Sequence, residues 1–198
     1  MTKLLIRFFD FVFSLTGLLI LFPFFLILSI IILVDSRGGI FFFQSRVGER
    51  NKDFRLWKFR TMYVDSERHG QITVGANDSR ITKPGKYLRK YKLDELPQLV
   101  NVLLGEMSLV GPRPEVRKYV ILYTPEQASV LSVKPGVTDY ASIEYSDENE
   151  LLSRSADPLK TYIEEIMPAK IRLNMKYIEN PSLKNYFKII FLTLGKIF

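Results

Sequence analysis

Two neighbouring acidic residues, Asp94 and Glu95, follow a strongly basic segment and precede Pro97. Proline is tolerated in the first turn of a helix, so we expect Asp94 to be the N-cap of a helix that begins beside it. The free amides and the positive end of such a helix would surround both acids. They would keep Asp94 ionised and let a phosphate or a metal-bound diphosphate lie alongside it. A nucleophilic carboxylate needs this setting.

Basic residues stand where they could bind phosphate groups near these acids. Residues 54–62 read as a strand in which Lys58 and Arg60 share one face, although an exposed basic strand is the commoner meaning of such a pattern. Arg113 lies between two prolines that restrict the backbone, so its guanidinium either grips a phosphate or belongs to a loop that ties two helices together. A run of cations without an intervening carboxylate approaches Asp94 and creates a positive field, namely Arg80, Lys83, Lys86, Arg89, Lys90 and Lys92.

Three segments carry a resemblance to a known family. They read KFRTM at residues 58–62, LDELPQ at residues 93–98 and MSLVGPRP at residues 107–114. In this order, and with the apolar N-terminal segment before them, they resemble the bacterial sugar transferases. Within that group the chain is most similar to the small monotopic polyprenyl-phosphate phosphoglycosyl transferases.

The resemblance implies a reaction and a set of site residues. The expected reaction moves a sugar 1-phosphate from a UDP-sugar to polyprenol (undecaprenyl) phosphate, through a covalent aspartyl-phosphosugar intermediate, and releases UMP. Asp94 is then the nucleophile, and Glu95 is the second catalytic acid and the ligand of Mg²⁺. The expected phosphate- or nucleotide-binding residues are Lys58, Arg60, Arg89 and Arg113.

Length and composition limit the number of domains, the kinds of site and the partners that this chain can have. A chain of 198 residues suits one domain, and the absence of cysteine excludes disulfides, thiolate zinc sites and a cysteine nucleophile. The single histidine, His69, receives no role and cannot form a His-rich metal cluster. Any metal is therefore expected to be magnesium bound by oxygen ligands. The net charge of +7 suits nucleic acid, acidic lipid or a phosphorylated substrate. No recognised nucleic-acid-binding motif accompanies that charge, and nucleic acid is not an expected partner.

The N-terminal segment predicts a membrane helix. Residues 11–34 contain no charged side chain and have the length of a bilayer-crossing helix, and Pro23 near the middle predicts a bend. Lys3 and Arg7 before the segment and Arg37 and Arg46 after it put positive charge at both ends. From these residues alone a kinked span is favoured over a hairpin that enters one leaflet and returns. The family resemblance reverses that preference, because its members are held by a re-entrant helix broken at this proline.

The remaining elements follow from local patterns. Residues 40–47 and 54–62 predict a β-hairpin. The helix from Asp94 is expected to end at Gly105 and to bury a stripe formed by Leu96, Leu99, Val100, Leu103 and Leu104. Residues 134–138 predict a turn, with a specificity region after it at residues 139–150. Asp157 and Pro158 predict a helix that runs to Glu179 and bends at Pro168.

Residues 182–198 predict an amphipathic helix that lies in the membrane interface or docks on a protein. The expected fold class is therefore α+β, helix-rich and monotopic. The expected organisation is a re-entrant membrane helix over residues 1–36, a catalytic domain over 37–180 on the cytoplasmic face of the bacterial inner membrane, and an interfacial helix over 181–198. The oligomeric state is not predicted. A noncatalytic adaptor that binds acidic membranes through its basic patch is the alternative function.

Overall fold

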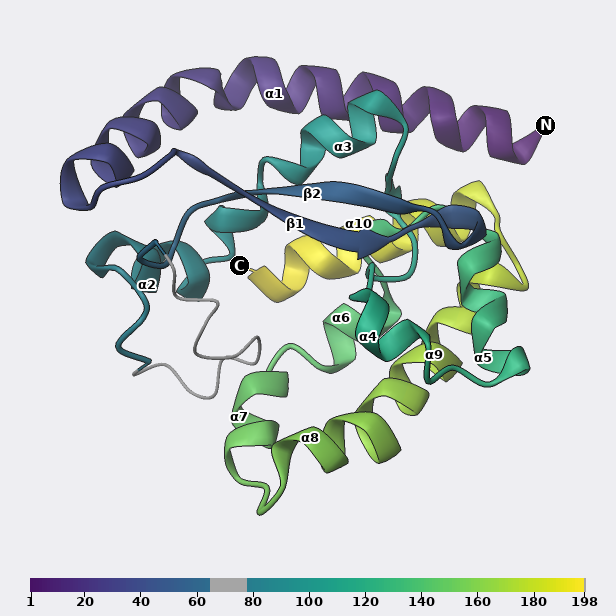
Figure 1. Ribbon diagram of the computed structural model, residues 1–198. Coiled ribbons are helices and arrows are strands. Elements are labelled where there is room, and N and C mark those ends of the chain that lie inside the picture. Colours follow the sequence, from purple (N-terminus) through teal and green to yellow (C-terminus); the bar gives the residue numbers. More distant parts are fainter. Residues whose placement is uncertain (65–77, 198) are drawn as a thin grey trace.

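The computed structural model describes residues 1–64 and 78–197. His69, to which the sequence gave no role, lies outside them. The described residues form one long helix, two small two-stranded sheets and a series of short helices, which confirms the helix-rich α+β class. In Figure 1 the long helix α1 lies along one side of the molecule above β1, β2 and α3, and α7 and α8 lie on the opposite side.

Helix α1 spans Thr2–Asp35 and contains Pro23. It is long and apolar enough to cross a membrane, as judged by its length and composition. The predicted break into two helices is not seen, because one helix continues through the proline and follows a smooth curve (Figure 1). Proline removes a single backbone hydrogen bond, and a helix can bend at that point instead of ending.

The predicted hairpin is confirmed with shorter strands. Strands β1, Phe41–Val47, and β2, Asp53–Phe59, pair antiparallel, with Phe42 opposite Lys58, and the 3₁₀ turn η1, Glu49–Asn51, joins them. On one side of the hairpin, Phe59 packs with Leu28 and Ile32 of α1. On the other side, alternate residues of β1 and Lys58 line a cavity.

The segment that carries the two acids folds differently from the prediction. Helix α2, Lys83–Lys90, ends before a 3₁₀ turn, η3, that spans Leu93–Glu95. Helix α3, Gln98–Leu104, begins only after this turn. Asp94 is therefore inside η3, and the N-cap position of α3 belongs to Pro97.

The buried face of α3 also differs from the predicted apolar stripe. Its buried residues are Gln98, Asn101 and Val102, whereas Leu104 is 65% exposed. Asn101 explains the polar face: its amide donates to the carbonyl of Arg55 at 2.7 Å and accepts from the amide of Trp57 at 3.0 Å. These bonds satisfy backbone groups of β2 that have no strand partner on that side. Gly105 ends the helix with a positive φ of 84°, as predicted.

A second sheet lies behind the cavity. Strand β3, Ser108–Val110, pairs in parallel with β4, Gly136–Thr138, which the sequence had indicated only as a turn. Between them the chain forms α4, Arg117–Val120, α5, Pro125–Ala128, and the 3₁₀ turn η4, Ser129–Ser132. A methyl group added to Gly136 would lie 2.1 Å from the amide nitrogen of Gly111, so the two chains approach as closely as glycine permits.

The C-terminal half is helical. Helices α6, Tyr140–Glu144, and α7, Glu148–Ser153, precede α8, Pro158–Thr161, a π-helical turn η5, Tyr162–Ile166, and α9, Met167–Ile178. Asp157 caps α8 by accepting from the amide of Lys160 at 3.0 Å, which confirms the predicted helix start. The predicted interruption near Pro168 is the π-helical turn directly before it.

Helix α10, Leu183–Ile197, packs one face on the protein itself. Its Tyr186 is fully buried and donates a hydrogen bond of 2.9 Å to Asp10 of α1. Asp10 also accepts from the amide of Leu109 and the hydroxyl of Ser108 in β3, at 2.8 and 3.0 Å. This one carboxylate thus joins α1, β3 and α10. Phe191, on another face of α10, is 68% exposed.

Candidate active site

The two acids lie side by side in sequence but have opposite surroundings. The turn that holds them begins at Lys92, whose φ of 53° places the backbone in the left-handed region. This conformation reverses the chain after α2 and directs both carboxylates towards a cavity with a volume of about 830 Å³. Such a volume is in the usual range for small-molecule sites.

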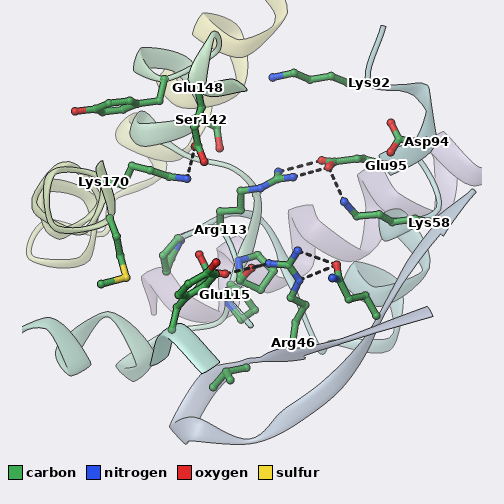
Figure 2. A pocket seen from close by; sticks show the side chains of 18 of the residues that line it. Arg46, Lys58, Lys92, Asp94, Glu95, Arg113, Glu115, Ser142, Glu148 and Lys170 are labelled. Atoms are coloured by element: carbon green, nitrogen blue, oxygen red, sulfur yellow. Dashed lines mark hydrogen bonds and ion pairs between the residues drawn. The ribbon is translucent and has the colours of Figure 1, made fainter. Parts of the chain in front are cut away.

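Glu95 is held by two cations. It accepts from the ammonium of Lys58 at 2.9 Å and from both terminal nitrogens of Arg113, in a bidentate arrangement that Figure 2 shows. Burial alone would raise the pKa of Glu95, but the charges and hydrogen bonds of Arg113 and Lys58 outweigh it and hold the pKa well below 4.5. Glu95 is therefore a permanent anion at neutral pH.

Asp94 lacks such partners. It is only 8% exposed, and its carboxylate makes no hydrogen bond or ion pair with any described residue. Burial, with the negative charge of Glu95 beside it, raises the pKa of Asp94 to about 6, although Lys58, Arg89 and Arg113 pull the pKa down. An unpaired, desolvated carboxylate that ionises near neutral pH is available to attack a phosphorus atom.

Arg89 reaches this site from α2. Its Nε donates to the hydroxyl of Thr61 at 2.9 Å, and its positive charge favours the ionised form of Asp94. The amide of Thr82 donates to the carbonyl of Thr61 at 3.0 Å, and a methyl group on Gly85 would lie 2.2 Å from that carbonyl. Helix α2 is thus fixed tightly against the residues that follow β2.

Arg60 is among the residues that line the cavity, but its guanidinium binds the chain around the end of α1. Strand β2 ends at Phe59, so the alternation that would place Arg60 beside Lys58 stops there. The Arg60 guanidinium donates to four backbone carbonyls at the end of α1 and just beyond it, at 2.5 to 3.1 Å: those of Ile32, Ser36, Arg37 and Gly39. Its described hydrogen bonds fix the end of α1.

Sequence reasoning missed other residues that shape the cavity. Arg46 donates to the carbonyl of Pro114 at 2.9 Å and forms an ion pair with Glu115 at 3.4 Å, which holds the loop that carries Arg113 (Figure 2). The alternation of β1 places Arg46 on the same side of the hairpin as Lys58, and this signal could have identified it. Glu115 has no comparable local signal.

Asp139 fixes Arg113 from the opposite side. It accepts from the amide of Arg113 at 2.7 Å, from the side-chain amide of Asn174 at 3.1 Å and from the amide of Ser142. The sequence placed Asp139 at the start of a specificity region and gave it no role at the acids. Its contacts instead connect that region to Arg113 through one carboxylate.

The acids can accommodate magnesium together with a substrate diphosphate. The described residues contain no group of three His, Cys, Asp or Glu side chains suited to hold a metal by themselves. Magnesium often takes only one or two protein carboxylates and completes its shell with phosphate oxygens and water. Glu95 Oε2 accepts one described hydrogen bond, from Arg113, and therefore keeps a free lone pair for a cation.

Comparison with known proteins agrees with the geometry. The whole chain, residues 1–198, matches the family model described as bacterial sugar transferase. It is 38% identical over 178 residues to the UDP-N-acetylgalactosamine-undecaprenyl-phosphate N-acetylgalactosaminephosphotransferase of Aeromonas hydrophila. This alignment covers 88% of this chain and 39% of that protein. It is 37% identical over 197 residues to the undecaprenyl-phosphate glucose phosphotransferase of Komagataeibacter xylinus. This alignment covers 96% of this chain and 35% of that protein.

The chain thus spans less than half the length of these two relatives. The exopolysaccharide production protein PSS of Rhizobium leguminosarum bv. phaseoli has a similar length. It is 37% identical over 211 residues, an alignment that covers 100% of both chains.

Proposed function

Because this chain belongs to the bacterial sugar transferase family, we propose that it transfers a sugar 1-phosphate from a UDP-sugar to undecaprenyl or a related polyprenol phosphate. The observation that carries the proposal is the unpaired, buried Asp94 beside the cations that bind Glu95. The names of the two longer relatives describe transfer of sugar phosphates to undecaprenyl phosphate, which supports the same substrate class.

The reaction proceeds in two displacements at phosphorus. An Asp94 carboxylate oxygen attacks the β-phosphorus of the donor, a new P–O bond forms, and the bond to the bridging oxygen breaks so that UMP leaves. The sugar 1-phosphate is then covalently attached to Asp94. An oxygen of the polyprenol phosphate next attacks the same phosphorus, Asp94 leaves as a carboxylate, and a polyprenyl diphosphosugar is released. Neither step needs a protein group to remove a proton.

The cations of the cavity stabilise the charge that moves during these steps. Lys58, Arg89 and Arg113 lie close enough to Asp94 to act on its ionisation, and they therefore also act on a phosphate bound beside it. Glu95 would hold magnesium together with diphosphate oxygens, and the ion would neutralise charge on the leaving group. The permanent negative charge of Glu95 keeps Lys58 and Arg113 in place before the donor arrives.

The way α1 packs supports a re-entrant rather than a crossing topology. A helix of 34 residues is about 50 Å long, so a perpendicular span could touch a domain on one side of the membrane only near one end. In this chain the first turns of α1 bond to the domain through Arg7 and Asp10, and the last turns pack through Leu28 and Ile32 against Phe59. Figure 1 shows α1 along the domain over its whole length.

In this arrangement, the catalytic acids lie at the cytoplasmic surface of the bacterial inner membrane, where a soluble donor and an embedded acceptor can meet. The exposed side of α1 carries the large apolar residues that would contact lipid, among them Leu4, Phe8, Leu19, Ile20, Phe22, Ile27, Ile30 and Val34. Accessibility of tags at the two ends of the chain tests the topology. Two cytoplasmic ends are expected, and ends on opposite sides would contradict it.

The reaction is tested by incubating the purified protein with UDP-sugar labelled in the β-phosphate, without acceptor. The label should become attached to Asp94 while UMP is released. Asp94→Asn should abolish both, whereas the exposed Asp147→Asn control should keep both. Label on another residue would refute the nucleophile assignment. If no UDP-sugar in a broad panel gives UMP or a lipid-linked product, the noncatalytic membrane adaptor is the better description.

Glu95→Gln tests the metal site separately. Because the amide is a poorer magnesium ligand than the carboxylate, the magnesium concentration that gives half-maximal turnover should rise. An unchanged magnesium dependence in this variant would remove Glu95 from the metal site.

A further inference from the structure

The cavity continues beyond Arg113 to a second polar surface, which we call the distal wall. It consists of Tyr119 of α4, Ser142 of α6, Glu148 of α7, and Lys170 and Asn174 of α9, all of which line the cavity. In Figure 2 the labelled Ser142, Glu148 and Lys170 lie on one side of Arg113, and Asp94 and Glu95 lie on the other. The proposed mechanism makes no use of these residues.

Three oxygen atoms of the distal wall are buried and unsatisfied. Ser142 Oγ, Asn174 Oδ1 and the Tyr119 hydroxyl have no hydrogen-bond partner among the described residues. Tyr119 is 7% exposed and Asn174 is 6% exposed, so water does not cover them freely. Buried polar atoms without partners are rare and costly in folded proteins. All three atoms belong to residues that line one cavity, so a ligand bound there could supply the missing hydrogen-bond donors.

We propose that the distal wall binds the hydroxyl groups of the donor's sugar and thereby selects which UDP-sugar the protein uses. This inference rests on the proposed sugar phosphate transfer. Asn174 Oδ1 and the Glu148 carboxylate can only accept hydrogen bonds, and the two hydroxyls can accept them as well. A pyranose offers several O–H donors to such a surface, whereas uracil offers one N–H and two carbonyl acceptors. The chemistry of the wall therefore favours the sugar over the base.

The contacts around Arg113 place the wall at a suitable position for this role. Asp139 binds the backbone of Arg113 and, through its two oxygens, also Asn174 and the backbone of Ser142. A phosphate held between Asp94 and Arg113 would therefore have the distal wall next to it, and the sugar is attached directly to that phosphate. Lys170 bonds to Glu148 at 2.6 Å and orients the carboxylate at this surface.

Two conservative variants isolate the ligand contacts from the fold. Ser142→Ala and Tyr119→Phe each remove a hydroxyl that has no described partner, so neither breaks an intramolecular hydrogen bond. Their thermal midpoints should stay at or above that of the parent protein. Glu144→Gln is the matched control, because Glu144 is exposed on α6 and does not line the cavity.

The test measures equilibrium binding of UDP and of UDP-glucose, UDP-galactose, UDP-N-acetylglucosamine and UDP-N-acetylgalactosamine to the full chain carrying Asp94→Asn, which prevents turnover. One UDP-sugar should bind more tightly than UDP. Ser142→Ala and Tyr119→Phe should each weaken that binding about three- to tenfold and leave UDP affinity unchanged. Equal weakening of UDP and UDP-sugar would assign the wall to the nucleotide, and unchanged affinity for both would leave it without a ligand. Either result overturns the inference.

Failure of the proposed function has a different signature. If the proposed function is wrong, the unmodified protein will release no UMP when it is given polyprenol phosphate and the same donors. The binding comparison does not depend on that reaction.

Discussion

Replacing Asp94 by asparagine should stabilise the folded protein while removing its activity. Burial raises the pKa of Asp94 from 3.8 to about 6, so the ionised carboxylate is less favourable in the fold than in the unfolded chain. The penalty is absent below the unfolded pKa and complete above the folded pKa. From these two pKa values it is on the order of 3 kcal/mol at pH 7.5 and falls below about 1 kcal/mol at pH 4.

The assay is thermal unfolding of the detergent-solubilised chain at both pH values. For a chain of this size each kcal/mol corresponds to a midpoint change of about 2–4 °C, so Asp94→Asn should raise the midpoint by about 6–12 °C at pH 7.5 and by about 1–2 °C at pH 4. A lower midpoint at pH 7.5, or a gain that does not depend on pH, would refute the argument that Asp94 is held unfavourably ionised.

Glu95→Gln is the matched comparison, because the same substitution at the neighbouring acid should act in the opposite direction. The pKa of Glu95 is held well below 4.5, so its ionised form stabilises the fold above that pH and the contribution is lost as pH falls through the folded pKa. The variant also leaves Lys58 and Arg113 without their counter-charge. We expect a loss of about 3 kcal/mol at neutral pH. Stabilisation by both variants would mean that the two acids share one environment.

Other predictions follow from the same contacts. The pH profile of kcat/KM for UMP release should fall on the acidic side with a pKa of about 6, because only ionised Asp94 attacks; a flat profile down to pH 4.5 would exclude Asp94 as the nucleophile. Arg60→Met should lower the free energy of unfolding by about 2–4 kcal/mol, measured by denaturant titration, because several carbonyls around the end of α1 lose their donor. Gly136→Ala should cost about 2–3 kcal/mol in the same titration and reduce UMP release by separating β4 from Gly111, whereas Gly195→Ala, with open space around it, should be harmless.

Local patterns were sufficient for the elements that depend on neighbouring residues. The hairpin followed from β-rich alternation around a turn, the end of α3 from Gly105, and the start of α8 from Asp157 and Pro158. Each of these features is decided within a few residues, so the sequence contains the relevant information. The residues alone favoured one helix bent at Pro23, and α1 is one continuous helix; the expectation of a break came from the family resemblance.

The site was predictable in its members but not in their roles. The sequence analysis named Lys58, Arg89, Asp94, Glu95 and Arg113, and all five line one cavity. Arg60 belongs to the same segment as Lys58 and lines the same cavity, yet β2 ends one residue before it and its described hydrogen bonds go to carbonyls around the end of α1. Sequence spacing cannot reveal where a strand stops when the stop depends on packing against another helix.

The sequence by itself determined which side chains this protein has for chemistry at phosphate and that its N-terminal segment is long and apolar enough for a membrane helix. The tertiary structure decided that two adjacent acids have opposite surroundings. Arg113, 18 positions along the chain from Glu95, and Lys58, 37 positions before it, both bind Glu95 and leave Asp94 unpaired. A pKa depends on burial and on charges a few ångströms away, and residues distant in sequence supply those charges only after the chain has folded.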